Sequence, residues 1–146
     1  MKRAIIIGIG NSGRQDDGLG WAFLEKIEQQ MPDLYDLEYR YQLQIEDAEL
    51  ISHYDSVLFV DADLTIHPQG FKLQPLLSRA TNSYTSHELS PGTVLDLCKK
   101  VYRKSPDCYL LTISGNSFNL EMGLTTFAKI NLASALIFFE KEYLQS

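Results

Sequence analysis

The sequence is poor in cysteine. Its 146 residues include two cysteines, Cys98 and Cys108, which do not form a C-x-x-C pair. Two isolated cysteines in a chain of this length build neither a disulfide scaffold nor a zinc site, and they are typical of a protein in a reducing compartment. We therefore expect both to be buried or partly buried free thiols.

Positive charge is also scarce. Thirteen Lys and Arg residues stand against nineteen Asp and Glu residues, so the formal net charge is −6, and no segment concentrates its basic residues. Nucleic-acid binding depends on clustered positive charge that neutralises phosphates. The composition therefore argues against a nucleic-acid partner.

The sequence contains no long apolar run, and we expect no leader segment. No run approaches the roughly 20 apolar residues of a membrane-spanning helix, and Met1-Lys2-Arg3 leads directly into an apolar strand without the features of a secretory signal. The chain also lacks repeats, low-complexity tracts and linkers. Because 45% of its residues are hydrophobic, it can bury a sizeable core. We expect one soluble, cytoplasmic domain spanning residues 1–146, with no membrane partner.

The sequence does contain an alternation of apolar strands and amphipathic helices. After a first strand that begins at Ala4, the pattern predicts strands at 37–43, 56–63, 71–76 and 107–114, and helices at 20–30, 46–54, 91–102 and 125–144. Ser90 and Pro91 are typical of a helix start. Alternating strands and helices imply right-handed crossovers. The expected fold class is α/β: a three-layer α/β/α sandwich with a twisted, mainly parallel five-stranded sheet and helices on both faces.

The loop after the first strand admits two interpretations. The segment Gly8-Ile9-Gly10-Asn11-Ser12-Gly13 matches the G-x-G-x-x-G fingerprint of dinucleotide-binding domains. That fingerprint needs a helix that opens at once with its N-terminus on the pyrophosphate. Here Asp16 and Asp17 intervene, and they would repel phosphates. The second strand also runs to Gln44 without the acid expected to bind the ribose, so nucleotide binding is the less favoured hypothesis.

Carboxylates follow two of the apolar strands. Asp16 and Asp17 lie in the glycine-rich loop, while Asp61 and Asp63 end the strand at 56–63. Open α/β sheets place their sites at the carboxyl ends of strands, so the Asp17 loop and Asp61 would meet in one crevice. Other roles stay open: Asp16 or Asp17 can cap a helix, Asp61 can be a turn residue, and Asp63 can substitute for Asp61.

His87 completes a possible set with Asp17 and Asp61. Two carboxylates and one imidazole suit a divalent transition metal, and paired acids can also act as general acid and base. By itself, His87 would more simply be a surface or capping histidine. His53 and His67 are expected at the surface.

Three motifs together resemble the hydrogenase maturation proteases. They are Gly8-Ile9-Gly10-Asn11 followed by Asp16-Asp17-Gly18-Leu19-Gly20, then Val60-Asp61-Ala62, then Ser86-His87-Glu88-Leu89-Ser90-Pro91. Members of this family are endopeptidases that remove the C-terminal extension from the precursor of the [NiFe]-hydrogenase large subunit. The order and spacing of the motifs span most of the chain.

The resemblance implies a sheet with helices on both faces and a site that detects nickel already installed in the precursor. It places the family's two acidic ligands on Asp17 and Asp61 and its histidine on His87, as both catalytic and metal-contacting residues. It implies no permanently bound cofactor, since the nickel comes with the substrate. The partner would be the large-subunit precursor, and we expect a monomer. Cleavage would use a water polarised by the metal or by a carboxylate, and Asp61 is our choice of base because it ends a rigid central strand.

The chain departs from the family after its second motif. The family commonly has a glycine and a Pro-Gly there, whereas this sequence reads Asp63-Leu64-Thr65-Ile66-His67-Pro68-Gln69-Gly70. We therefore expect a different loop beside the substrate groove. A later segment, Glu121-Met122-Gly123-Leu124, resembles the family's E-x-G-L and is interpreted as scaffold or groove. Two other functions stay open: a nucleotide-binding domain that uses Gly8–Gly13, and a non-catalytic nickel-binding maturation factor.

Overall fold

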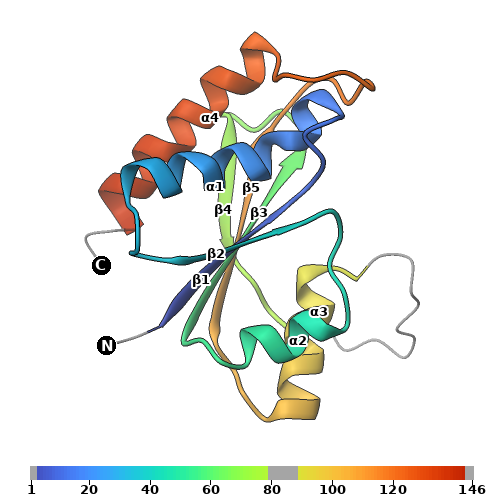
Figure 1. The fold of residues 1–146 in the computed structure, drawn as a ribbon, viewed down its shortest axis with the longest axis vertical. Coiled ribbons are helices and arrows are strands. Elements are labelled where there is room, and N and C mark those ends of the chain that lie inside the picture. Colours follow the sequence, from blue (N-terminus) through green and yellow to red (C-terminus); the bar gives the residue numbers. More distant parts are fainter. Residues whose placement is uncertain (1–2, 79–88, 144–146) are drawn as a thin grey trace.

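A five-stranded sheet runs through the middle of the computed structural model, which describes residues 3–78 and 89–143 (Figure 1). In chain order, its strands are β1 (Ala4–Ile9), β2 (Asp36–Arg40), β3 (Ser56–Asp63), β4 (Phe71–Pro75) and β5 (Asp107–Ser114). The order across the sheet is β2-β1-β3-β5-β4. All neighbours are parallel except β4, which is antiparallel to β5. The predicted mainly parallel sheet is confirmed.

Helices cover both faces of this sheet (Figure 1). One face packs against α1 (Leu19–Gln30) and α4 (Thr126–Phe138), and the other packs against α2 (Glu46–Ile51) and α3 (Pro91–Leu97). The predicted three-layer α/β/α sandwich is therefore confirmed. No helix in the described ranges is both long enough and apolar enough to cross a membrane.

The inner strands are apolar throughout because both of their faces are covered. Alternate side chains of β3 enter different cores: Leu58 and Val60 pack under α1 and α4, whereas Val57 and Phe59 pack under α2 and α3. Strand β3, which bears Asp61, occupies the centre of the sheet as expected, and β1 lies beside it. These two adjacent strands end at the same edge of the sheet.

Helix α1 lies unusually close to the two inner strands. A Cβ at Gly20 would come within 2.6 Å of the carbonyl oxygens of Ile9 and Val60, so only glycine allows this approach. The other end of the layer is closed by aromatic packing, with the rings of Phe23 and Phe139 meeting edge to face at 5.5 Å. The start of α1 is thereby held over the carboxyl ends of β1 and β3.

The edge strand β2 is shorter than predicted. It ends at Arg40, whose carbonyl accepts hydrogen bonds from the Gly10 amide (2.9 Å) and from Trp21 Nε1 (3.1 Å). Beyond it the chain crosses to the other layer, where Leu43 is buried.

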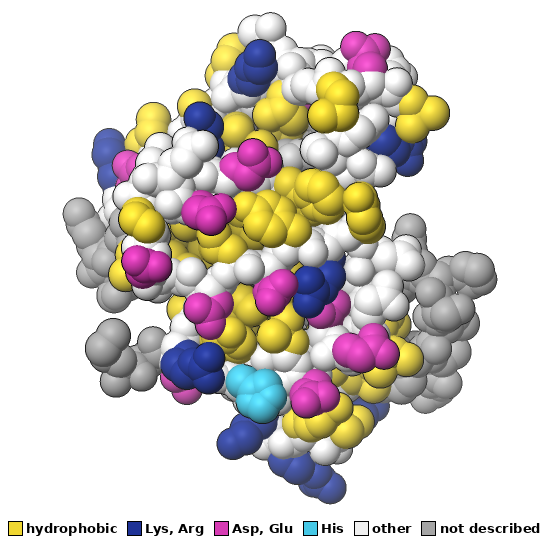
Figure 2. Space-filling view, in the orientation of Figure 1, with side chains coloured by type: hydrophobic (Ala, Val, Ile, Leu, Met, Phe, Trp, Pro, Cys, Tyr) yellow, Lys and Arg dark blue, Asp and Glu magenta, His cyan; other side chains and the backbone are white. Residues whose placement is uncertain are grey.

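Figure 2 shows a band of hydrophobic side chains across the middle of the face of the molecule that is turned to the viewer. At the junction of α1 and β2, the rings of Tyr39 and Tyr41 lie 5.9 and 5.0 Å from that of Trp21.

The caps of α3 and α4 follow the sequence signals. Ser90 Oγ accepts from the Thr93 amide at 3.1 Å, and Pro91 takes the first helical position, as predicted. Thr125 caps α4 through the Ala128 amide at 3.2 Å. Both helices continue as π-helical turns at Cys98–Tyr102 and Phe139–Tyr143, so helical structure reaches Tyr102 as predicted although the α-helical parts are shorter. The helix expected at 46–54 ends at Ile51.

Both cysteines are buried and unpaired, as expected. Cys98 and Cys108 lie in the core under α2 and α3. Burial raises the pKa of the Cys108 thiol to about 12. A thiol so rarely ionised is a poor nucleophile, which agrees with a structural role.

Candidate functional site

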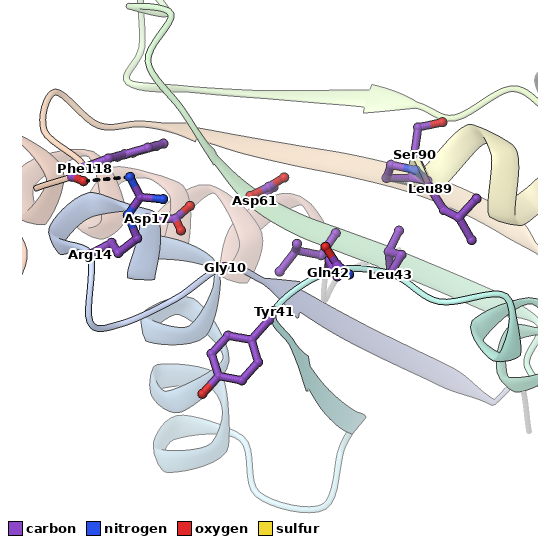
Figure 3. A pocket seen from close by; sticks show the side chains of 12 residues that line it. Gly10, Arg14, Asp17, Tyr41, Gln42, Leu43, Asp61, Leu89, Ser90 and Phe118 are labelled. Carbon is purple, nitrogen blue, oxygen red and sulfur yellow. Dashed lines mark hydrogen bonds between the residues drawn. The ribbon is translucent and has the colours of Figure 1, made fainter. Parts of the chain in front are cut away.

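A pocket of about 490 Å³ opens at the carboxyl end of the two inner strands (Figure 3). Its walls come from the loops that follow β1, β2 and β5, from the end of β3, and from the start of α3. The lining residues are Ile9, Gly10, Arg14, Asp17, Tyr41, Gln42, Leu43, Asp61, Leu89, Ser90, Pro91 and Phe118. The pocket therefore brings together Asp17 and Asp61, two of the three site residues predicted from the sequence.

The backbone around Asp17 is fixed against the end of β1. Its carbonyl oxygen accepts from the Asn11 amide at 3.0 Å, and its own amide donates to the Arg14 carbonyl at 3.0 Å. Gly10 has a φ of 149°, and a Cβ there would collide with the Asp17 carbonyl oxygen. The glycine is needed so that the turn can fold back and present Asp17 to the pocket.

Asp17 is a partly buried carboxylate. Burial raises its pKa above the usual value, and the nearby Arg14 guanidinium opposes this only in part. Arg14 is held at the pocket by a hydrogen bond from Nη2 to the Phe118 carbonyl at 3.3 Å (Figure 3). A second cation entering the pocket would stabilise the ionised form of Asp17 further.

Asp61 approaches the same pocket from the end of β3. It pairs with Thr112 in the register between β3 and β5. Its Oδ1 accepts a hydrogen bond from the Ala62 amide at 2.8 Å, which helps to set the orientation of the carboxylate. Figure 3 shows Asp17 and Asp61 on neighbouring parts of the pocket wall, each from a different strand end.

Asp16 has surroundings unlike those of its neighbour Asp17. It is fully buried, and Oδ1 accepts from the Thr125 amide at 2.8 Å. Oδ2 accepts from Thr125 Oγ1 (2.8 Å) and from the amides of Asn116 (2.9 Å) and Ser117 (3.2 Å). Asp16 thus joins the glycine-rich loop to the β5–α4 loop and to the cap of α4. Of the two acids left open by the sequence, Asp16 is the structural one.

Asp63 is also held by its own loop. Its Oδ1 accepts from the Thr65 amide at 2.9 Å, and its Oδ2 lies 3.2 Å from His67 Nε2. Partial burial acts to raise the pKa of Asp63, but these hydrogen bonds outweigh it and hold the pKa below its usual value. The prediction that His67 is a surface residue is wrong, since its side chain is 11% exposed and also contacts Thr112 Oγ1. His53 is exposed, as expected.

His87 falls in the segment 79–88, outside the described residues. The described chain resumes with Leu89, Ser90 and Pro91, which line the pocket. Within residues 3–78 and 89–143, no three His, Cys, Asp or Glu side chains are grouped closely enough to hold a metal ion. The roles of Asp17, Asp61 and His87 therefore stay predictions.

The sequence interpretation missed several residues of the pocket. Arg14 is the one basic residue between Gly8 and Gly20, so its position beside two acids was a visible signal. Tyr41 and Phe118 belong to no motif. They reach the pocket only because the loops after β2 and β5 end at the same edge of the sheet.

The geometry gives no support to nucleotide binding by the glycine-rich loop. A pyrophosphate site needs backbone amides directed at the ligand. Here the Gly10 amide donates to Arg40, the Asn11 amide to Asp17, and the Gly13 amide to Asn11 Oδ1 at 2.9 Å. Three amides of the fingerprint are therefore already used within the protein.

Neither a family model nor a curated protein matches this sequence. Solved structures do match its fold. The hydrogenase maturating endopeptidase HybD from E. coli superposes with a TM-score of 0.73 at 20% identity, over 92% of this chain and 88% of that one. The [NiFe] hydrogenase maturation protease HycI from Thermococcus kodakarensis gives 0.69 at 24% identity, over 93% and 90%.

A hydrogenase 2 maturation peptidase from a Thaumarchaeota archaeon gives a TM-score of 0.67 at 19% identity, over 95% of this chain and 97% of that one. The similarity thus extends over nearly the whole of each chain. At these identities the comparison establishes the fold. The chain has the fold of the hydrogenase maturation proteases, which is the fold that its sequence motifs implied.

Proposed function

We propose that the chain is an endopeptidase that removes the C-terminal extension from a nickel-loaded [NiFe]-hydrogenase large-subunit precursor. It would act in the cytoplasm and as a monomer. The observation that supports this most is the pocket shared by Asp17 and Asp61, because the two acids come from separate elements of a fold found in structures named as maturation endopeptidases.

In this proposal the nickel belongs to the substrate. Asp17 and Asp61, together with His87, contact the ion that the precursor presents, since carboxylates and imidazole are suitable ligands for it. The raised pKa of Asp17 supports this role, because a desolvated carboxylate gains more from an incoming cation than a well-solvated one. The ion then positions the bond to be cut beside the pocket.

Asp61 is the proposed general base. It lies within the central strand of the sheet, two residues before the strand ends, so its backbone is held by the strand pairing. The hydrogen bond from the Ala62 amide to Oδ1 restricts rotation of the carboxylate. A water polarised by the metal or by Asp61 would attack the peptide carbonyl, with Asp61 accepting its proton and returning it to the amine that leaves as the C–N bond breaks.

A cleavage assay tests the proposal. The purified protein is incubated with nickel-loaded precursor and, separately, with nickel-free precursor. The masses of the products are then measured by mass spectrometry. We expect a single C-terminal fragment from the nickel-loaded precursor and none from the other. Equal cleavage of both, or of neither, would contradict the proposal. Tight stoichiometric nickel binding by the isolated protein without processing would favour the non-catalytic nickel-binding factor.

A further inference from the structure

Three loops at the carboxyl edge of the sheet contain no Asp, Glu, Lys or Arg. They are residues 41–45 after β2, 64–70 after β3, and 115–120 after β5, in a chain that is 22% charged. Figure 1 shows that the ends of these strands lie on the same side of the molecule. Surface loops are ordinarily rich in charge, so three neutral loops at one edge call for an explanation.

These loops, together with Met122 just beyond the third of them, expose large apolar side chains. We define the apolar edge as the six residues Tyr41, Ile45, Leu64, Ile66, Leu120 and Met122, which are between 57% and 86% exposed. They make up half of the large hydrophobic residues that are exposed in the described part of the chain. Exposed apolar groups gathered in this way mark a surface that another molecule covers.

The apolar edge borders the pocket. Tyr41 lines it directly, and Phe118 lines it from the loop that bears Leu120. The loop after β3 is joined to the end of β5, because Ser114 Oγ accepts from the His67 amide and donates to the Thr65 carbonyl at 2.8 Å. The loops after β3 and β5 are therefore joined, and all three loops lie at the edge of the sheet where the pocket opens.

Tyr41 is held in place although it is 70% exposed. Its ring packs against that of Trp21 at a centroid distance of 5.0 Å. An exposed aromatic ring that is already fixed loses little conformational freedom when a partner covers it. This arrangement is typical of an anchor in a protein interface.

We propose, resting on the proposed function, that the apolar edge is the surface on which the folded body of the large-subunit precursor docks. An extended peptide is bound along a single groove or strand, whereas residues on three separate loops match a folded surface. The charged residues that line the described pocket are Arg14, Asp17 and Asp61, so its centre is net acidic. A partner with an apolar surface around a bound cation complements this pattern, and its metal then faces the two carboxylates.

Charge substitutions at the apolar edge test this proposal. Leu120→Lys, Leu120→Asp and Ile66→Lys alter side chains that are 86% and 74% exposed, so the fold tolerates them. Val101→Lys is the matched control, because Val101 is also 61% exposed but lies in the turn after α3, at the end of that helix farthest from the pocket. We expect each edge variant to raise KM for the nickel-loaded precursor about tenfold with kcat within about twofold, as for loss of binding alone. The control should behave like the wild type.

The two substitutions at Leu120 separate apolar contact from electrostatics. If an apolar partner surface covers this position, a positive and a negative charge both weaken binding. If only one sign weakens it, the contact is electrostatic and the docking proposal is wrong. It is also wrong if the Leu120 and Ile66 variants behave like Val101→Lys, in which case nickel-dependent cleavage by the wild type would still support the proposed function.

Failure of the proposed function gives a different result. If the wild type leaves the nickel-loaded precursor intact, the protease assignment is contradicted. The affinities of the same variants for the uncut precursor, measured by biolayer interferometry, then test the docking proposal independently of cleavage. About tenfold weaker binding by the edge variants supports docking, whereas equal binding by the edge variants and control, or no binding by the wild type, overturns it.

Discussion

The ends of β1 and β3 each present two carboxylates, and the members of each pair have different surroundings. After β1, Asp17 lines the pocket whereas Asp16 is buried among four hydrogen bonds. At the end of β3, Asp61 lines the same pocket whereas Asp63 is bound to the loop that follows it. The two anchoring acids hold the loops, and the two pocket acids are placed by them.

The difference shows in how each charge is stabilised. Hydrogen bonds from Thr65 and His67 hold the pKa of Asp63 below its usual value despite partial burial. The pKa of Asp17 is raised by burial, so its charge is disfavoured in the folded protein. The ionised Asp17 side chain therefore lowers the stability of the folded protein. Groups with perturbed pKa values gather at functional sites, and this cost is expected of a carboxylate whose role is to bind a cation brought by the substrate.

The largest expected effect is on the rate of cleavage, and it should distinguish Asp61 from Asp63, which lie two residues apart on one strand. Asp61→Asn should reduce cleavage of the nickel-loaded precursor at least about 1,000-fold, equivalent to about 4 kcal/mol in the barrier, because both the metal contact and the base are lost. We expect the same for Asp17→Asn and His87→Ala. Asp63→Asn is the matched control and should retain cleavage within about tenfold. Initial rates measured by gel densitometry decide this, and loss of activity in Asp63→Asn alone would reverse the assignment.

The next effect is on stability and separates Asp16 from Asp17. Asp16→Ala leaves three partly buried backbone amides without the acceptor that the fully buried Asp16 carboxylate provides, so the free energy of unfolding should fall by about 3 kcal/mol. Urea denaturation followed by circular dichroism measures this, with Asp17→Ala as the control that stays near the wild type. A stable Asp16→Ala variant without cleavage activity would show instead that Asp16 belongs to the active site.

Much of the fold was predictable because burial on both faces leaves a simple pattern in the sequence. The bounds of β3 and β5 match the prediction, since both strands are long apolar runs. The end of β2 was not predictable, because it depends on hydrogen bonds from Gly10 and Trp21 to the Arg40 carbonyl. Such contacts join residues far apart along the chain and leave no periodic signal.

The expectation that sites lie at the carboxyl ends of strands led to the region of the pocket, but by itself it could not separate the two members of each pair. Asp16 and Asp17 are equivalent in the sequence. They differ in the structure because Asn116 and Thr125, about 100 residues later, direct their donors at one of them. The burial of His67 likewise depends on Asp63 and on a threonine of β5.

A smaller effect concerns Asp63 and its pH dependence. Because the folded-state pKa of Asp63 is lowered, its charge stabilises the folded protein above the ordinary pKa of Asp. That stabilisation is lost as the pH falls through the lowered pKa. Asp63→Asn should therefore lower the free energy of unfolding at pH 7 by at most about 1 kcal/mol, since the pair with His67 is partly exposed. Urea unfolding at several pH values should show the difference from the wild type shrinking in acid; a difference independent of pH would contradict this origin.

The smallest effect has the opposite sign and concerns Asp17. Its raised pKa means that the folded protein loses stability as the pH rises from the ordinary pKa of Asp through the raised one. Asp17→Asn removes that penalty, so at pH 7 it should be more stable than the wild type by about a few tenths of a kcal/mol, because solvent screens a partly exposed group. Thermal unfolding of the two proteins at pH 7 and in acid measures the difference. A variant that is less stable at pH 7 would show that Asp17 supports the fold in the same way as Asp16 and Asp63, and the contrast between pocket and anchoring acids would then fail at the end of β1.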